Sequence, residues 1–503
     1  MPYEDLQEYI KELEARGKLR RVSKPVDKDW EIGCISRWVY QSLPDSERYA
    51  LLYENVIGHD TPVAVGLVGA SREVYAIGLQ CAPEQIFERW IHALAHPVPV
   101  KPVQTGPVKE VIAHGTDVDL LKIPTCIWTP GKDGGAYLTA NCVITKDPET
   151  GIQNMGNYRM QLKGKDMTAM QVFPNQHVGL HLQKWQARKQ NMPVCVCIGV
   201  DPTVSMSAVA KVPYGVDELT ISGALRGAPI EVVKAETCDL LVPARAQYIL
   251  EGEIAYDEEI DEGPFGEYAG YMGLPTPKKI FRVKCVTRRR QPIYQAYISQ
   301  IAPSESCTIQ QEAIGAMMYK HLALDLKIPG IKDVYFTEAS AKAWLIIQMK
   351  PLYPGHSKKV MVIASNLLDA NCPKMVTVVD DDIDIRDPWA VEWATTFRVD
   401  PAYDVQIVQD TETIILDPTT MDISGEGRAR HLRERVTGSK LLIDATLKKT
   451  YPDISLPTRD LMMKALENWR ETGLPPITPQ KRTLLLLEKH PGNQGLYWDP
   501  FKG

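Results

Sequence analysis

The middle of the chain constrains the fold most, because residues 110–300 consist of short β-branched segments separated by turn residues. Segments of roughly four to eight residues with this composition favour strands over helices. They are found at 140–145, 167–173, 193–200, 280–287 and 292–297. The pattern predicts a mainly β central domain with a barrel-like sheet.

The N-terminal part of the chain combines helical and strand patterns. Apolar residues recur at helical spacing from Leu6 to Leu13, after Asp5 and before Gly17, which predicts a short amphipathic helix. Prolines then cluster between residues 97 and 107, and such clustering is typical of a linker. We therefore place a domain boundary near residue 105.

Beyond residue 305, helical and strand patterns alternate again. A helix over 310–325 is expected before strands at 334–336, 343–349 and 375–379, and a helix over 461–472 lies in the tail. The sequence thus predicts a mixed α+β fold in four parts: an α/β N-terminal domain, a central β domain, a C-terminal α/β domain and a helical oligomerisation tail. Their expected ranges are 1–105, 106–305, 306–440 and 441–503.

Composition excludes several classes of protein. The 57 Lys and Arg residues against 63 Asp and Glu give a net charge of -6, which provides no general attraction for nucleic acid or anionic lipid. The sequence has no signal-peptide pattern and no apolar run of about 18 residues, so we expect a cytoplasmic protein without a membrane span. The ten cysteines include no Cys-x-x-Cys pair, which argues against a disulfide framework and a thiolate zinc site.

Common catalytic motifs are missing from the sequence. It contains no Gly-x-Gly-x-x-Gly, P-loop, His-Glu-x-x-His or Gly-x-Ser-x-Gly pattern. The acidic run 380–384 matches the Asp-Asp-x-x-Asp motif of prenyl synthases, but it follows a Val-rich strand and precedes Asp387-Pro388, a typical helix start. We therefore expect a structural role for this run.

The segment Glu262-Gly-Pro-Phe-Gly-Glu267 is more informative. Gly and Pro between two carboxylates build a tight turn, which lets both side chains converge on one cavity. Convergent carboxylates require a cation between them, and burial can then make one of them a proton donor. By itself the segment is more often a turn that carries two solvated acids.

Amide, imidazole and carboxylate side chains elsewhere suggest a metal site. Asn154 and His177 carry ligand atoms that suit manganese or magnesium beside a phosphate, and Glu236 is a candidate third ligand. No spacing rule links these three residues, and a lone histidine is more often part of a core or loop.

Together and in this order, these segments resemble the UbiD family of decarboxylases, which use prenylated FMN. The resemblance rests on Asn-x-x-x-x-Arg at 154–159, Gln176-His177, Lys-Ala-Glu-Thr at 234–237, the Glu262–Glu267 segment and the acidic run. It implies a split, flavin-reductase-like β-barrel as the cofactor domain, between an α/β N-terminal domain and a C-terminal oligomerisation domain. It also implies a manganese ion and a potassium ion beside the flavin phosphate.

The resemblance further implies roles for individual residues. Asn154, His177 and Glu236 match the manganese ligands, and Arg159, Glu262 and Glu267 match the family's catalytic network, with Glu267 as the proton donor. The residues that would line the cofactor are Asn154, Met155, Gly156, Asn157, Tyr158, Arg159, Gln176, His177 and Glu236. No lysine aligns with the phosphate-binding lysine of fungal members, so that role stays unassigned.

The substrate implied is an aromatic, heteroaromatic or α,β-unsaturated carboxylic acid. Phe173 and Tyr268 occupy positions where the family lines its substrate pocket, although either can equally be a core residue. The alternatives are a carboxylase working in reverse, a non-catalytic subunit of a larger carboxylase, and a metal-dependent hydrolase. Expected partners are a flavin prenyltransferase, which supplies the cofactor, and further copies of the chain in a dimer or hexamer.

Overall fold

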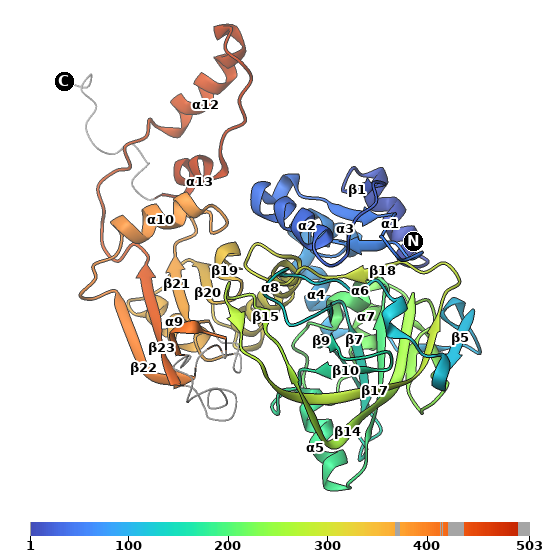
Figure 1. The fold of residues 1–503 in the computed structure, drawn as a ribbon. Helices are drawn as coiled ribbons and strands as arrows, with labels where there is room; N and C mark the ends of the chain where they lie inside the picture. The colour runs from blue at the N-terminus through green and yellow to red at the C-terminus, as the bar shows by residue number, and fades with distance from the viewer. Residues whose placement is uncertain (1, 368–372, 413, 415, 421–436, 491–503) are drawn as a thin grey trace, which may run out of the picture. The chain divides into compact units, whose positions relative to one another are not determined.

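The computed structural model describes residues 2–367, 373–412, 414, 416–420 and 437–490. These residues fall into two compact units, one that ends at Met317 and one that contains the described residues from Met318 onward. The mixed α+β fold predicted from the sequence is confirmed (Figure 1). None of the described helices is long and apolar enough to cross a membrane.

A four-stranded sheet flanked by helices forms the N-terminal part of the first unit. Asp5 caps the first helix by accepting hydrogen bonds from the backbone N–H groups of Gln7 and Glu8, and the predicted apolar face of this helix is buried. The strand order is β1 (Leu19–Val22), β2 (Ala50–Tyr53), β3 (Val63–Val65) and β18 (Tyr294–Ala296). The helices are α1 (Leu6–Ala15), α2 (Glu31–Ser42), α3 (Arg72–Gly78) and α4 (Ile86–Ala95).

Strand β18 lies in a different sheet from the one predicted. The segment 292–297 was expected in the central sheet, but β18 pairs in parallel with β3 of the N-terminal sheet. The chain therefore returns from the central domain to complete the first one.

The central sheet is antiparallel and curls into a half barrel (Figure 1). Its two longest strands, β14 (Tyr248–Glu262) and β17 (Thr276–Arg288), pair along most of their length. Gly252 marks a bulge between them, where a Cβ atom would lie 1.9 Å from the carbonyl oxygen of Arg282. The other strands are β5 (Val111–His114), β6 (Tyr137–Leu138), β7 (Cys142–Lys146), β8 (Gln153–Asn157), β9 (Met160–Leu162), β10 (Met167–Met170) and β11 (Met192–Ile198).

Smaller elements surround this half barrel. The helices are α5 (His177–Ala187), α6 (Pro202–Ser207), α7 (Glu218–Arg226) and the start of α8 (Glu305–Tyr319). A three-stranded sheet contains β4 (Lys101–Pro102), β12 (Glu231–Lys234) and β13 (Leu241–Pro243), and a two-stranded ribbon contains β15 (Phe265–Gly266) and β16 (Met272–Gly273). Cys195 and Cys197 of β11 are buried.

The second unit is built on a five-stranded sheet with the order β19-β20-β21-β23-β22. The expected acidic run follows β21, where Asp382 accepts two hydrogen bonds from Arg398 and Asp387 caps the next helix. The expected structural role of the run is confirmed. The elements are β19 (Ile331–Phe336), β20 (Trp344–Met349), α9 (His356–Ala364), β21 (Met375–Val379), α10 (Pro388–Phe397), β22 (Val405–Glu412), β23 (Thr437–Ala445), α12 (Arg459–Glu467) and α13 (Lys481–Lys489). The rest of the expected tail, 491–503, lies outside the described residues.

Candidate functional site

Arg159 joins the two glutamates of the Gly-Pro turn in one buried network. Its Nε and Nη2 atoms donate to the two carboxylate oxygens of Glu262 at 2.9 and 3.0 Å, and Nη1 donates to Glu267. Glu262 is fully buried and Glu267 is 9% exposed. A planar guanidinium fixes the positions of two carboxylates and compensates their charge. The cation between the convergent acids is therefore Arg159.

The turn itself brings the glutamates together. Glu262 is the last residue of β14, and a cis bond joins Gly263 to Pro264. The φ angle of Gly263 is +109°, in the region that favours glycine, and its N–H donates to Gln161 Oε1 at 3.2 Å. The chain thereby reverses within a few residues, so that Glu267 returns to the guanidinium that Glu262 holds.

The surroundings of the network stabilise the protonated, positively charged form of Arg159. Burial alone lowers the pKa of Arg159, but the charges of Glu267 and Glu262 outweigh it and hold the pKa above its usual range. The Arg159 guanidinium also lies over the Phe265 ring, 4.7 Å from its centroid. Burial and the charge of Glu262 raise the pKa of Tyr137, so this phenol stays protonated beside the network.

A second cluster contains Asn154, His177 and Glu218. Asn154 lies on β8, while His177 and Glu218 are the first residues of α5 and α7. The Nδ1 atom of His177 lies 3.8 Å from Glu218 Oε1, and the Asn154 amide can donate to these two atoms at 2.9 and 3.1 Å. Glu218 is 2% exposed, and burial raises its pKa. An amide, an imidazole and a carboxylate therefore converge at two helix N-termini.

Glu236 does not belong to this cluster. Its carboxylate instead pairs with Lys109, whose ammonium also donates to the backbone oxygen of Lys234. The physical reason is topological: Glu236 follows β12 of the three-stranded sheet, whereas α7 carries Glu218 to Asn154 and His177. The structure therefore places Glu218, and not the expected Glu236, beside Asn154 and His177.

The donor set of the cluster suits a divalent cation. Amide and carboxylate oxygens with one imidazole nitrogen are ligands for manganese or magnesium. Among the residues that the structure describes, no group of three or more His, Cys, Asp or Glu side chains could hold a metal ion, so the amide of Asn154 is needed as the third ligand. Turning this amide about its side-chain bond presents its oxygen in place of its nitrogen.

Three family models match the chain, and each is described as a domain of 3-octaprenyl-4-hydroxybenzoate carboxy-lyase. The N-terminal domain matches residues 10–94, the Rift-related domain 101–301 and the C-terminal domain 309–445. The chain belongs to the UbiD family. It is therefore a UbiD-class carboxy-lyase, and the resemblance stated from the sequence is confirmed.

Relatives and solved structures match nearly the whole UbiD chain. An uncharacterized protein of Archaeoglobus fulgidus is 32% identical over 94% of this chain and 99% of its own. The UbiD-class enzyme HmfF from Pelotomaculum thermopropionicum, solved with FMN, is 32% identical with a TM-score of 0.81 over 91% of this chain and 98% of its own. The vanillic acid decarboxylase of Sedimentibacter hydroxybenzoicus is 26% identical with a TM-score of 0.81, over 94% of this chain and 100% of its own.

The structure also gives the surroundings of the other expected site residues. The N–H of Met155 donates to Glu218 at 2.7 Å, and a Cβ atom on Gly156 would lie 2.4 Å from the hydroxyl of Tyr158. Gln176 accepts a hydrogen bond from the N–H of Phe173 at 3.1 Å and directly precedes the first residue of α5. Asn157 donates its N–H to the backbone of Ala208, and Phe173 and Tyr268 are both half-buried.

Two residues of the site were missed from the sequence. Glu218 follows Asp217, a helix cap, and this local pattern gives no sign of a ligand. Lys278 lies on β17 beside a second lysine and is only 8% exposed. In the structure Thr276, Lys278 and Ile280 alternate with more exposed residues, so Lys278 lies on the buried face of β17.

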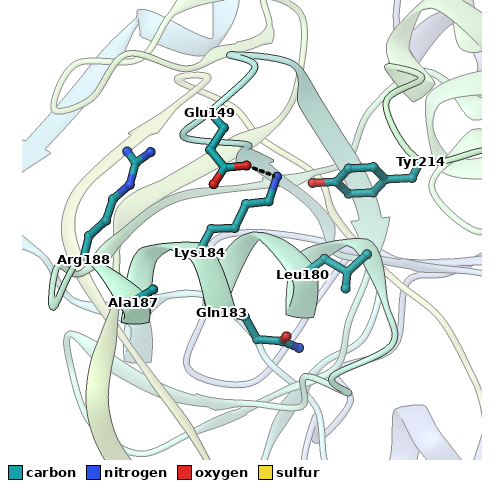
Figure 2. Close-up of a pocket in the computed structure, with 7 residues that line it drawn as sticks. All are labelled: Glu149, Leu180, Gln183, Lys184, Ala187, Arg188 and Tyr214. Carbon is teal, nitrogen blue, oxygen red and sulfur yellow. Dashed lines mark ion pairs between the residues drawn. The ribbon is translucent and has the colours of Figure 1, made fainter.

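A surface pocket of about 540 Å³ also lies on α5, away from the arginine network (Figure 2). Lys184 and Glu149 form an ion pair of 2.8 Å across it, and Figure 2 shows the hydroxyl of Tyr214 facing this pair. The residues that line the pocket are Glu149, Leu180, Gln183, Lys184, Ala187, Arg188 and Tyr214. None of them belongs to the network or to the Asn154 cluster.

Proposed function

We propose that this UbiD-family protein catalyses the reversible, non-oxidative decarboxylation of an aromatic, heteroaromatic or α,β-unsaturated carboxylic acid with prenylated FMN. The buried network of Arg159, Glu262 and Glu267 carries this proposal. It is supported by HmfF, which was solved with FMN and, in an evolved dimeric form, with prenylated FMN. The decarboxylase that acts on vanillic acid supports an aromatic acid as substrate.

The Asn154 cluster fits the phosphate end of the cofactor. We propose that Asn154, His177 and Glu218 hold a manganese ion that binds the flavin phosphate, at a place where the N-termini of α5 and α7 also favour an anion. The residues 155–159 and Gln176 would line the cofactor. A potassium ion beside the phosphate belongs to the same proposal, without an assigned residue.

Side chains of the protein would donate the proton and hold the donor in place. Prenylated FMN, when bound, supplies an electron sink for the loss of carbon dioxide. Glu267 donates the proton that replaces the carboxylate on the substrate carbon. Arg159 holds Glu267 in place through Nη1, and Glu262 holds Arg159 through the opposite edge of its guanidinium. Phe265 covers one face of that guanidinium and limits the access of water.

Co-expression with a flavin prenyltransferase tests the proposal. We expect the purified protein to release prenylated FMN on denaturation, to contain about one manganese ion per chain, and to liberate carbon dioxide from at least one aromatic or arylacrylic acid. Mass spectrometry, metal analysis and a carbon dioxide assay measure these results. A cofactor-loaded protein that releases no carbon dioxide would favour the non-catalytic subunit, and hydrolysis by apoprotein with manganese alone would favour the hydrolase.

The corrected ligand set gives a separate prediction. Glu218→Gln is expected to weaken Mn²⁺ binding by more than about 100-fold, since even outer-shell partners of a metal ligand cost 10–100-fold. Glu236→Gln is the matched control and is expected to leave the affinity unchanged, because Glu236 pairs with Lys109. Titration of the metal-free protein followed by electron paramagnetic resonance measures both. If Glu236→Gln weakened Mn²⁺ binding and Glu218→Gln did not, Glu236 would be the ligand.

A further inference from the structure

Lys278 is a buried lysine beside the proposed catalytic network. In the pairing of β14 with β17, Glu262 lies opposite Thr276, so Lys278 lies two residues further along β17 on the same face of the sheet. The side chain is 8% exposed, whereas its neighbour Pro277 is exposed. Residues of opposite strands related in this way are diagonal neighbours within reach of a long side chain.

The ammonium of Lys278 has no counter-ion within the described part of the chain. No carboxylate there lies within 4.0 Å of its Nζ atom. The nearest acids bind other cations, since Glu262 and Glu267 bind Arg159 and Glu259 pairs with Lys279 at 2.9 Å. Burial lowers the pKa of Lys278, and the charge of Glu262 opposes this only in part. A buried ammonium without a partner is costly, so an anion that reaches it is bound strongly.

The positions of the charges bear on where such an anion can lie. When Glu267 carries the proton for the reaction, Arg159 and Lys278 are positive, and Glu262 and the reacting carboxylate of the substrate are negative. These four charges balance, so a second carboxylate is favoured by the position of Lys278 and not by the net charge of the site. The carboxylate that is lost must leave a carbon close to Glu267, which lies on the Nη1 edge of Arg159, whereas Lys278 shares a sheet face with Glu262.

The aromatic ring of Phe173 adds a surface for a flat substrate. The Lys278 ammonium lies 6.0 Å from the centroid of this ring. A planar acid that stacks on Phe173 would therefore present a substituent to the ammonium at its rim. The geometry combines a stacking wall, a buried cation and the proton donor in one region of the first unit.

We propose that Lys278 determines specificity by binding a second carboxylate of the substrate, so that the preferred substrate is an aromatic or arylacrylic diacid. The inference deepens the proposed function and rests on it. Lys278 then acts on the carboxylate that remains in the product, while Glu267 acts on the carbon that loses carbon dioxide. The reaction exchanges one carboxylate for a proton and leaves the carboxylate at Lys278 unchanged.

Matched pairs of acids test the proposal in the cofactor-loaded enzyme. The pairs are benzoic with terephthalic acid and cinnamic with 4-carboxycinnamic acid, which differ only by the second carboxylate. We expect the wild type to prefer the diacid of a pair by at least tenfold in kcat/KM, and Lys278→Met to lower kcat/KM for the diacid at least tenfold more than for the monoacid. Lys278→Arg should keep most of the preference. Lys279→Met, the adjacent lysine on the other face, should behave as the wild type.

A binding measurement separates this inference from the proposed function. Calorimetric titration of the full-length protein, purified after co-expression, should show tighter binding of the diacid than of the monoacid and loss of the difference in Lys278→Met. This holds even if neither acid releases carbon dioxide, a result that would count against the proposed function alone. Equal affinities in the wild type, or an equal loss for both acids, would overturn the role of Lys278. Lys278→Gln replaces Lys278→Met if the latter does not fold.

Discussion

Glu267→Gln is expected to lower kcat for decarboxylation by about 10²–10⁴-fold, the range that a positioned general acid contributes. Glutamine has the same shape and can still accept a hydrogen bond from Arg159, so the network and the fold are retained. The variant lacks only the acidic proton that replaces the lost carboxylate. Release of carbon dioxide by the cofactor-loaded variant, compared with the wild type at the same cofactor content, measures the effect.

A control from β14, the strand that leads into the turn, makes the result specific. Glu259→Gln changes an acid on β14 that pairs with Lys279 and not with Arg159, and it is expected to leave kcat within twofold of the wild type. The wild type, Glu267→Gln and Glu259→Gln should have the same cofactor content and the same circular dichroism spectrum. If Glu267→Gln kept a tenth or more of the wild-type rate, Glu267 would not be the proton donor.

The turn that carries Glu262 and Glu267 was predictable because its residues are contiguous. Gly263 and Pro264 fix the local backbone, so the convergence of Glu262 and Glu267 follows from local conformational preferences. Arg159 is more than a hundred residues away in the chain, and only the resemblance to the UbiD family connected it with the turn. The elements of the fold likewise divide into those set by local sequence and those set by contacts between distant parts of the chain. The first helix and the strand β21 follow from local periodicity, but the parallel pairing of β18 with β3 does not.

The cluster of Asn154, His177 and Glu218 shows where prediction from the sequence failed. Glu218 and Glu236 are both acids near the ends of regular elements, and neither has a local pattern that marks a ligand. Which of them reaches His177 depends on the path of the chain through α7 and β12, which is set by tertiary packing. The burial of Lys278 was not predicted for a similar reason, because burial of one face of β17 depends on the strand that pairs with it.

Removal of Arg159 is expected to affect both stability and activity. Arg159→Met leaves two buried carboxylates, Glu262 and Glu267, without the cation that lies between them. Breaking a buried ion pair by removing one partner costs about 3–5 kcal/mol of unfolding free energy. Activity should fall at least as far as in Glu267→Gln, because the proton donor also loses its position. Denaturant unfolding followed by tryptophan fluorescence, together with the carbon dioxide assay, measures the two effects.

The pH dependence of Arg159→Met distinguishes electrostatic repulsion from loss of packing. Protonation of either carboxylate relieves the repulsion, so the folded variant binds protons more tightly than the unfolded chain. Stability then falls as pH rises, and the deficit relative to the wild type should be larger at pH 8 than at pH 5. A loss of packing alone predicts an equal deficit at both pH values. Arg159→Lys supplies a charge without the planar fork, so it should recover stability more fully than activity, because a single ammonium cannot fix the positions of both carboxylates.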